Sequence, residues 1–275
     1  MPEGDTVFRT AARLRPALEH QILTGSDFRV PQFATADLTG KECTAVESRG
    51  KHLFIVCEDL TIHSHLMMEG HWDLYRAGER WHSPAFKARC VLTVEGAQAV
   101  GFELGFLRLL PSSERYDAVA HLGPDPLGSS WGAAEVLRRM RFWPDRSIAL
   151  VVLDQSVLAG IGNIYRCESL FMARINPHAL VSELTDAQLT RLIDVMHRLL
   201  NLNRERGRRI TTGTMGREPY WVYGRRGKPC LRCGAPVSHE RLGDPQLLRG
   251  RVGGDPANTE TVERDLFYCQ HCQRA

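Results

Sequence analysis

The sequence has no apolar run long enough to cross a lipid bilayer, which takes about 20 residues in a helix. A representative apolar stretch, residues 148–153, is far shorter than that. The first residues are polar, so no secretory signal peptide is visible. We therefore expect a cytoplasmic protein without a membrane partner, close to the nucleoid if its source is bacterial.

A large net charge is also lacking, because 35 basic residues balance 32 acidic ones and leave +3. The charge is nevertheless unevenly distributed. Between residues 204 and 232 there are nine basic and two acidic residues, so this segment carries 9 − 2 = +7. Tyr220, Trp221 and Tyr223 lie among these cations. Cations interleaved with aromatic rings are typical of nucleic-acid binding, since the cations meet phosphates and the rings stack on bases.

Disulfides are not expected in an intracellular chain, so its eight cysteines should be thiols or metal ligands. Four of them form two Cys-x-x-Cys pairs separated by 35 residues, and these are Cys230, Cys233, Cys269 and Cys272. Four thiolates at this spacing predict one structural zinc ion with no open coordination position. The other four, Cys43, Cys57, Cys90 and Cys167, have no such spacing and are expected to be buried small apolar side chains.

Hydrophobic periodicity divides the chain into a β-rich and a helical part. Val7, Ala11, Leu14 and Leu18 predict an amphipathic first helix, with Pro16 marking a kink or an early end. Residues 43–111 contain short β-rich runs that predict an antiparallel sandwich or flattened barrel. A Gly- and Pro-rich stretch, residues 112–131, resembles a linker, and the pattern beyond it is helical.

The N-terminus is a candidate nucleophile. If Met1 is removed, Pro2 becomes a secondary amine beside the carboxylate of Glu3. An α-amino group titrates near pH 7.7–8.0, so roughly 10–20% of it is unprotonated at pH 7. Such an amine can attack a sugar aldehyde carbon to form an iminium ion, and Glu3 would supply proton transfer. An inert processed terminus is the ordinary alternative.

Three further segments are candidates for contact with a nucleic acid. Lys51 follows a glycine at the start of a predicted strand and is in a position to reach a phosphate, although a solvated lysine is the common alternative. Met68 lies at a turn, where an exposed methionine can wedge between bases if it is not part of the core. Gly160 and Gly162 precede Asn163 at a predicted helix start, where free amides favour an anion, although such a pair also occurs in simple tight turns.

In their order and spacing these segments resemble the formamidopyrimidine-DNA glycosylase/endonuclease VIII family. The resemblance rests on the Met-Pro-Glu-Gly start, residues 50–53, 65–70 and 160–165, and the four cysteines. It implies an α+β protein with three parts: an N-terminal β-sandwich with a leading helix (1–112), a helix–two-turn–helix domain (113–215) and a zinc-bound β-hairpin finger (216–275). It also implies a monomer that binds double-stranded DNA containing damaged bases or abasic sites.

The resemblance assigns roles to individual residues. The implied catalytic residues are Pro2 as the nucleophile, Glu3 as the proton-transfer group, Lys51, and Glu168 near the terminal proline. The implied DNA-binding residues are Lys51, His65, Met68, Asn163 and Arg264. Together they imply a bifunctional DNA glycosylase and abasic-site lyase of base-excision repair, which acts through a Pro2 Schiff base with no redox cofactor.

The sequence departs from the family pattern at several points. Thr6 stands where the family commonly has a glutamate, although Asp5 is a possible substitute. Residues 102–108 lack the arginine-pair-plus-phenylalanine loop of the formamidopyrimidine branch, and the segment 211–222 is short for that branch's lesion-capping loop. We therefore expect the endonuclease VIII branch and oxidised pyrimidines. The finger interior contains an insertion, residues 250–256, which makes the match of Arg264 less direct. Rival interpretations are a non-catalytic DNA-binding module, an 8-oxoguanine enzyme and, more remotely, a zinc transcription factor.

Overall fold

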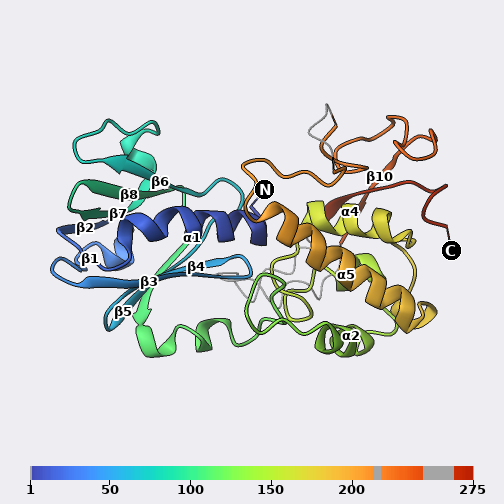
Figure 1. Cartoon of the computed structure of the whole chain (residues 1–275), viewed down its shortest axis with the longest axis horizontal. Coiled ribbons are helices and arrows are strands. Elements are labelled where there is room, and N and C mark those ends of the chain that lie inside the picture. Colours follow the sequence, from blue (N-terminus) through green and yellow to red (C-terminus); the bar gives the residue numbers. More distant parts are fainter. Residues whose placement is uncertain (1, 214–217, 244–262, 275) are drawn as a thin grey trace. The chain divides into compact units, whose positions relative to one another are not determined.

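The computed structural model describes residues 2–213, 218–243 and 263–274. It divides into two compact units, Met1–Ala120 and His121–Ala275. The first unit holds one long helix and two sheets, and the second holds most of the helices and a two-stranded hairpin (Figure 1). The narrower domain limits 1–112, 113–215 and 216–275 remain predictions. The finger insertion, residues 250–256, lies outside the described residues.

The first unit is a β-sandwich made of two antiparallel sheets, as predicted. The five-stranded sheet has the order β1-β3-β4-β5-β9 and the four-stranded sheet the order β2-β7-β8-β6. The strands are β1 (Gln21–Ile22), β2 (Gly25–Phe28), β3 (Glu42–Arg49), β4 (His52–Cys57), β5 (Leu60–His65), β6 (His71–Arg76), β7 (Ala88–Val94), β8 (Ala97–Phe102) and β9 (Phe106–Pro111). Short 3-10 turns follow β2, precede β7 and follow β9: η1 (Pro31–Phe33), η2 (Ala85–Lys87), η3 (Ser112–Glu114) and η4 (Asp117–Val119).

Helix α1 (Gly4–Leu18) packs on β3, β4 and β6 (Figure 1). Its apolar stripe, Val7, Ala11, Leu14 and Leu18, is at most 1% exposed and belongs to the same buried cluster as the inward side chains of both sheets. Pro16 lies in the last turn of α1 and the helix ends two residues later, so the proline does not interrupt the stripe. The burial of this stripe fixes the start of the helix, and therefore the N-terminus, on the sandwich.

Strand β4 is buried along its whole length, because both of its faces are covered. Leu53, Ile55 and Cys57 point into the sandwich core. On the opposite face, Phe54 stacks on His63 of β5, with ring centroids 4.4 Å apart. This second face carries the histidines of β4 and β5 described below.

The second unit has its own core. Its helices are α2 (Ala133–Arg141), α3 (Ile148–Val151), α4 (Asn163–Ala173) and α5 (Asp186–Asn203), with a 3-10 turn η5 (Val181–Glu183) before α5. Strands β10 (Ser238–Leu242) and β11 (Arg264–Tyr268) pair antiparallel as the predicted finger hairpin. Helices α2, α4 and α5 pack together, and β11 packs on α4. The fold is therefore the expected α+β arrangement of a sandwich, a helical region and a hairpin.

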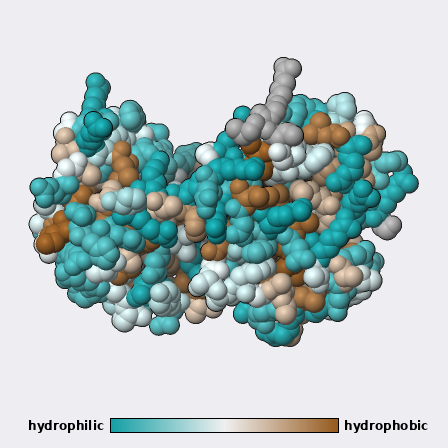
Figure 2. Space-filling view, viewed as in Figure 1, coloured by the Kyte–Doolittle hydropathy of each residue, from teal (hydrophilic) through white to brown (hydrophobic). Residues whose placement is uncertain are grey.

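The surface of both units is mainly hydrophilic in the view of Figure 2, with hydrophobic residues in separate small patches. Over the described parts of the chain, no helix combines the length and apolarity required to span a membrane.

Candidate DNA-binding and catalytic residues

Pro2 immediately precedes α1 and is half-buried. The next residue, Glu3, is the N-cap of the helix: its carbonyl oxygen accepts hydrogen bonds from the backbone N–H groups of Thr6 (2.9 Å) and Val7 (3.2 Å). Glu3 is fully buried. The first turn of a helix favours an acidic side chain, because the unpaired N–H groups there carry partial positive charge. Packing of α1 on the sandwich thus holds an imino acid and a buried carboxyl group next to each other.

Thr6 and Asp5 do not form a second free acidic site at this terminus. The buried carboxylate of Asp5 is paired with the guanidinium of Arg9 one helical turn later, at 3.1 Å. Arg9 also donates to the hydroxyl of Thr6 at 3.4 Å. Asp5 is therefore engaged in a partly buried ion pair within α1, and Glu3 is the carboxyl group that directly follows the terminal proline.

Lys51 lies in the tight turn between β3 and β4, one residue before β4 begins. Gly50 adopts φ 57° there, a conformation that costs a residue with a Cβ atom more than it costs glycine. Lys51 affects His65 at the end of the neighbouring strand β5. Burial lowers the pKa of His65 to about 4, and the positive charge of the Lys51 ammonium adds to this effect. Lys51 and His65 are thus brought together at one end of β4 and β5, which the sequence alone did not predict.

The turn after β5 carries the predicted wedge. Met67 and Met68 are 43% and 64% exposed, although methionine is usually buried. Met67 has φ 55°, which is uncommon for a side-chain-bearing residue. The amide of Gly70 donates to the carbonyl oxygen of Leu66 at 2.8 Å and closes the turn. The structure therefore presents two adjacent methionines on a tight turn, where the sequence prediction named only Met68.

In the second unit, Asn163 begins α4 directly after the N-cap Gly162. Its side-chain amide donates to the carbonyl oxygen of Asp265 at 2.8 Å. The same carbonyl accepts from the guanidinium of Arg166 at 3.0 Å, and that guanidinium also lies 3.5 Å from the carbonyl oxygen of Arg264. Helix α4 therefore holds the first residues of β11, including Arg264, by two side chains.

Arg166 is a residue that the sequence analysis missed. It is 0% exposed, and among the described residues its Nε and Nη1 atoms have no hydrogen-bond partner. A charged side chain is rarely buried in this way unless its interactions require it. Its bonding partners are backbone carbonyls about 100 positions later in the chain, so no local pattern could have indicated them.

Glu168 is also fully buried, and its carboxylate accepts four hydrogen bonds. The backbone N–H groups of Trp221, Val222 and Tyr223 donate at 2.8–2.9 Å, and the hydroxyl of Thr211 donates as well. Burial raises the pKa of Glu168, while these four donors favour the ionised form and oppose that rise. All four donors belong to one segment, which this carboxylate ties to α4.

The four predicted zinc ligands converge at the base of the β10–β11 hairpin. The Sγ atoms of Cys230, Cys233, Cys269 and Cys272 all lie within 4.8 Å of one another. Cys230 and Cys272 are 4.0 Å apart, and Cys233 and Cys269 are 3.5 Å apart. A tetrahedral zinc ion with Zn–S bonds of about 2.3 Å places its sulfur atoms about 3.8 Å apart. The donor set therefore fits one closed four-thiolate zinc site, as predicted. The remaining cysteines are buried, which agrees with their predicted role as core side chains.

Several cations of the basic segment have structural partners. Arg225 is 5% exposed and donates to the carbonyl oxygens of Trp221 and Pro229. The guanidinium of Arg232 lies 4.2 Å from the ring centroid of Phe171. The formal charge of +7 therefore overstates the number of cations that this segment offers to a phosphate backbone.

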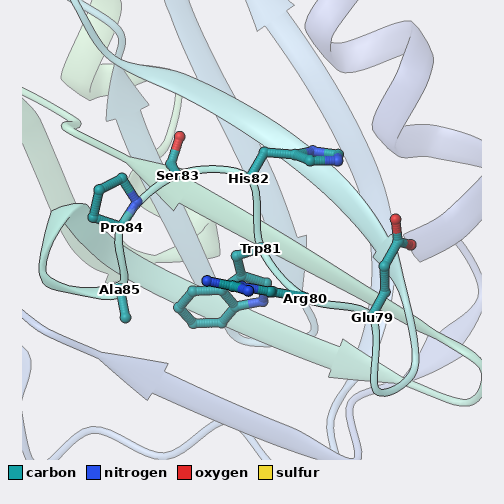
Figure 3. Close-up of a pocket in the computed structure, with 7 residues that line it drawn as sticks. All are labelled: Glu79, Arg80, Trp81, His82, Ser83, Pro84 and Ala85. Carbon is teal, nitrogen blue, oxygen red and sulfur yellow. The ribbon is translucent and has the colours of Figure 1, made fainter.

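The first unit has a surface hollow of about 580 Å³. A single loop, residues 79–85 between β6 and η2, lines it (Figure 3). Trp81 anchors this loop by donating to the side-chain oxygen of Gln98 at 2.8 Å and by packing near the guanidinium of Arg29. None of the predicted nucleophilic, acidic or metal-ligating residues lines the hollow.

Comparison with known proteins gives two family matches. Residues 1–103 match the formamidopyrimidine-DNA glycosylase N-terminal domain, and residues 122–214 match the formamidopyrimidine-DNA glycosylase H2TH domain. The chain is 43% identical to "Probable endonuclease 8 2" of Streptomyces coelicolor, over 99% of this chain and 94% of that protein. It is also 43% identical, over the whole of both chains, to "DNA-(apurinic or apyrimidinic site) lyase Nei2" of Mycolicibacterium smegmatis. Identity to the formamidopyrimidine-DNA glycosylase of Stutzerimonas stutzeri is 31%, again over both chains.

Solved structures give the same fold. A Lactococcus lactis Fpg in complex with DNA containing an abasic site superimposes with a TM-score of 0.78 at 23% identity, covering 99% of this chain and 100% of that one. MutM in complex with DNA containing carbocyclic 8-oxo-G gives a TM-score of 0.78 at 24% identity, with both chains fully covered.

Proposed function

Since this chain belongs to the formamidopyrimidine-DNA glycosylase/endonuclease VIII family, on the endonuclease VIII side, we propose that it is a bifunctional DNA glycosylase and abasic-site lyase of base-excision repair. The observation that carries this proposal is the N-terminus, where Pro2 precedes a buried N-cap carboxyl group, Glu3. Full-length relatives whose names are endonuclease 8 and abasic-site lyase support it.

In the proposed mechanism the nitrogen of Pro2, freed by removal of Met1, attacks C1′ of the damaged nucleotide. The bond from C1′ to the base breaks and its electron pair leaves with the base, so that C1′ carries the Pro2 nitrogen, which loses its proton, and the ring oxygen O4′. The C1′–O4′ bond then breaks, Glu3 transfers a proton to O4′, and the nitrogen lone pair forms an iminium ion with C1′. This iminium ion acidifies C2′. Loss of a C2′ proton then expels the 3′ phosphate, which cleaves the strand. A second elimination would remove the sugar, and hydrolysis of the iminium restores the amine.

The proposed DNA grip consists of Lys51 and His65 in the first unit and Asn163 and Arg264 in the second. The location of Lys51 in a turn supports a phosphate contact, because the turn brings its ammonium to the surface of the fold. Asn163 lies at a helix start, where backbone amides favour an anion, and its buried side chain holds the backbone of Asp265. The exposed Met68 would fill the space left by an everted base. Extrusion costs a few kcal/mol and is least costly for a damaged, poorly stacked base, which contributes to selectivity. We propose duplex DNA as the partner, one protein copy for each lesion and, if the source is bacterial, association with the nucleoid.

Oxidised pyrimidines are the proposed substrates. In the loop between β8 and β9, Glu103 pairs with Lys87 at 2.9 Å and Leu104 is 6% exposed. This loop therefore offers no extended arginine to read the opposite strand. An 8-oxoguanine specificity is the alternative, and comparing cleavage of thymine-glycol duplexes with 8-oxoguanine:cytosine duplexes distinguishes the two.

Glu168 fits a positioning role better than direct contact with the reacting sugar. Its carboxylate is saturated by four donors from residues 211–223, so its proposed function is to hold that segment. The zinc ion is likewise structural, because four thiolates leave no coordination position for a substrate.

Borohydride trapping tests the catalytic proposal. Protein with Met1 removed should form a covalent adduct with abasic-site DNA upon reduction, and peptide mapping should place the linkage on Pro2. Pro2→Gly keeps an amine at the terminus, and we expect a large loss of adduct but retained DNA affinity, because phosphate contacts dominate binding. Processed wild-type protein that binds this DNA but yields no adduct would instead indicate a non-catalytic binding module.

A further inference from the structure

The turn after β5 is held by a hydrogen bond from its own strand. The backbone N–H of Met67 donates to Nδ1 of His65 at 2.9 Å. The donor of this bond, Met67, is the residue at which the chain enters the left-handed region, with φ 55°. A left-handed conformation of a residue with a side chain is unfavourable unless its surroundings determine it. The ring of His65 is therefore part of what fixes the direction of the two methionines.

The second ring nitrogen of His65 has a defined role because the first is occupied. In a neutral imidazole with Nδ1 as the acceptor, the proton lies on Nε2, which is then a donor. Burial and the Lys51 ammonium lower the pKa of His65 to about 4, so the ring is neutral at ordinary pH. Within the described part of the protein, no hydrogen bond from Nε2 of His65 is found.

The ring itself is fixed from its other side. The ring of His65 packs edge-on against that of His52, with centroids 5.2 Å apart and planes at 78°. His52 is 4% exposed and its Nδ1 lies 2.9 Å from Nε2 of the buried His63. A rotation of His65 would therefore disturb a packed cluster of histidines, so a group bound at Nε2 and the amide bound at Nδ1 are held at a constant separation.

Met67 transmits this position to the neighbouring loop. A Cβ atom added to Gly105 would lie only 2.5 Å from Cγ of Met67, so the methionine side chain packs directly on the backbone of Gly105. Met68 follows it and is 64% exposed. The turn thus has one methionine seated against the β8–β9 loop and one directed outward.

We propose that His65 couples the phosphate grip to base eversion: its Nε2–H binds a DNA phosphate while its Nδ1 holds the Met67 amide, which keeps Met67 against the β8–β9 loop and so directs Met68 into the duplex. This inference rests on the proposed function and extends it. Phosphate binding and insertion of the methionine then occur together, because the His65 ring that contacts the DNA backbone also holds the methionine turn in place. His65 acts on the everted base only through the methionines, and is a positioning residue in that respect.

Two substitutions separate the nitrogens of His65. His65→Asn places an oxygen near the position of Nδ1 and loses the distant donor. His65→Gln places an amide N–H near the position of Nε2 and loses the acceptor for Met67. A third variant, Gly105→Ala, leaves His65 intact but displaces Met67.

Binding is measured on a duplex that carries a tetrahydrofuran abasic analogue next to 2-aminopurine, whose fluorescence rises when it is unstacked. For His65→Asn we expect a near-normal fluorescence amplitude at saturation but an affinity weaker by about tenfold or more, the effect of one lost hydrogen bond to a charged group. The slope of log affinity against log salt should stay that of wild type, because a neutral ring releases no counterion. For His65→Gln and Gly105→Ala we expect a strongly reduced amplitude with a smaller loss of affinity. Melting temperatures measured on each variant identify any that fails to fold.

Equal changes of affinity and amplitude in His65→Asn and His65→Gln would overturn the coupling, as would a normal amplitude in both His65→Gln and Gly105→Ala. The readout needs no catalysis. A wild-type protein that shows this pattern but forms no borohydride adduct would refute the lyase proposal and leave the coupling intact. A wild-type protein that forms the adduct, with variants that lack this pattern, would support the lyase proposal and refute the coupling.

Discussion

Glu168 accepts hydrogen bonds from three consecutive backbone amides, a geometry that a carboxylate satisfies and an amide side chain does not. Family resemblance placed this glutamate among the catalytic residues, and its contacts favour control of the segment that precedes the zinc ligands. A motif marks a residue as functional without stating whether it touches the substrate. That distinction depends on donors more than 40 positions away in sequence.

Replacing Glu168 by glutamine tests the positioning role. The new NH2 group would face backbone donors, and the buried groups left unsatisfied should lower the free energy of unfolding by about 1–3 kcal/mol. Glu205→Gln is the matched control, because Glu205 is exposed, and such surface changes usually stay within about 0.5 kcal/mol. Urea unfolding measures the free energy of unfolding of both variants. If the two variants are equally stable, Glu168 does not organise this segment.

The depressed pKa of His65 predicts a pH dependence of stability. Its pKa is about 4 in the folded protein and 6.5 in the unfolded chain, so between these values the unfolded state binds more protons. Stability from this group is therefore complete above pH 6.5 and is lost as the pH falls toward 4. His65→Gln should flatten the difference in unfolding free energy between pH 7 and pH 5. An unaltered profile in His65→Gln would contradict the buried neutral ring.

At the scale of elements, helices were predicted better than strands. The helical pattern expected beyond residue 131 is confirmed by helices α2 to α5, and the apolar stripe of α1 is buried as its spacing indicated. Strands β1 and β2 were not expected, because they are two and four residues long and β1 is exposed throughout. Such edge strands have no hydrophobic alternation, and only their pairing with β3 and β7 makes them strands.

The contact between α4 and β11 is another feature that sequence patterns do not reveal, and it predicts an energetic coupling. If Arg166 affects DNA binding only by holding the backbone at Arg264, its substitution should matter only while the Arg264 side chain is present. Arg166→Met should weaken binding roughly tenfold or more, since hydrogen bonds to charged groups contribute about 1.5–3 kcal/mol. In the Arg264→Ala background, the same substitution should have almost no further effect.

The four proteins are the wild type, Arg166→Met, Arg264→Ala and the double variant. Equilibrium titration of each with DNA at one salt concentration gives this coupling, and zinc content checks that the finger is intact. Arg174→Met at the exposed C-terminal end of α4 is the control and should bind like wild type. Additive losses from Arg166 and Arg264 would mean that the buried guanidinium acts on DNA by another route.

At the scale of the whole molecule, the order of motifs along the chain was enough to predict the fold class, although no single motif was. The charge distribution was less informative, because a formal count does not separate cations that face solvent from those that hold backbone carbonyls. Arg225, which is 5% exposed, is of the second kind. It donates to the carbonyl oxygens of Trp221 and Pro229, and only the folded structure shows this contact.

The two units have separate hydrophobic cores, and the zinc ligands Cys230 and Cys269 belong to the core of the second. A structural zinc site contributes about 10–16 kcal/mol in finger peptides, comparable with the whole stability of a domain. Removing the metal should therefore destabilise the second unit and leave the first folded. Calorimetry of the full chain should show two transitions, and Cys230→Ser or a chelator should lower the midpoint temperature of only one. Cys90→Ser, a buried substitution in the first unit, should lower the midpoint temperature of the other. A single transition that moves as a whole in both variants would show that the units unfold together and that the metal stabilises the entire molecule.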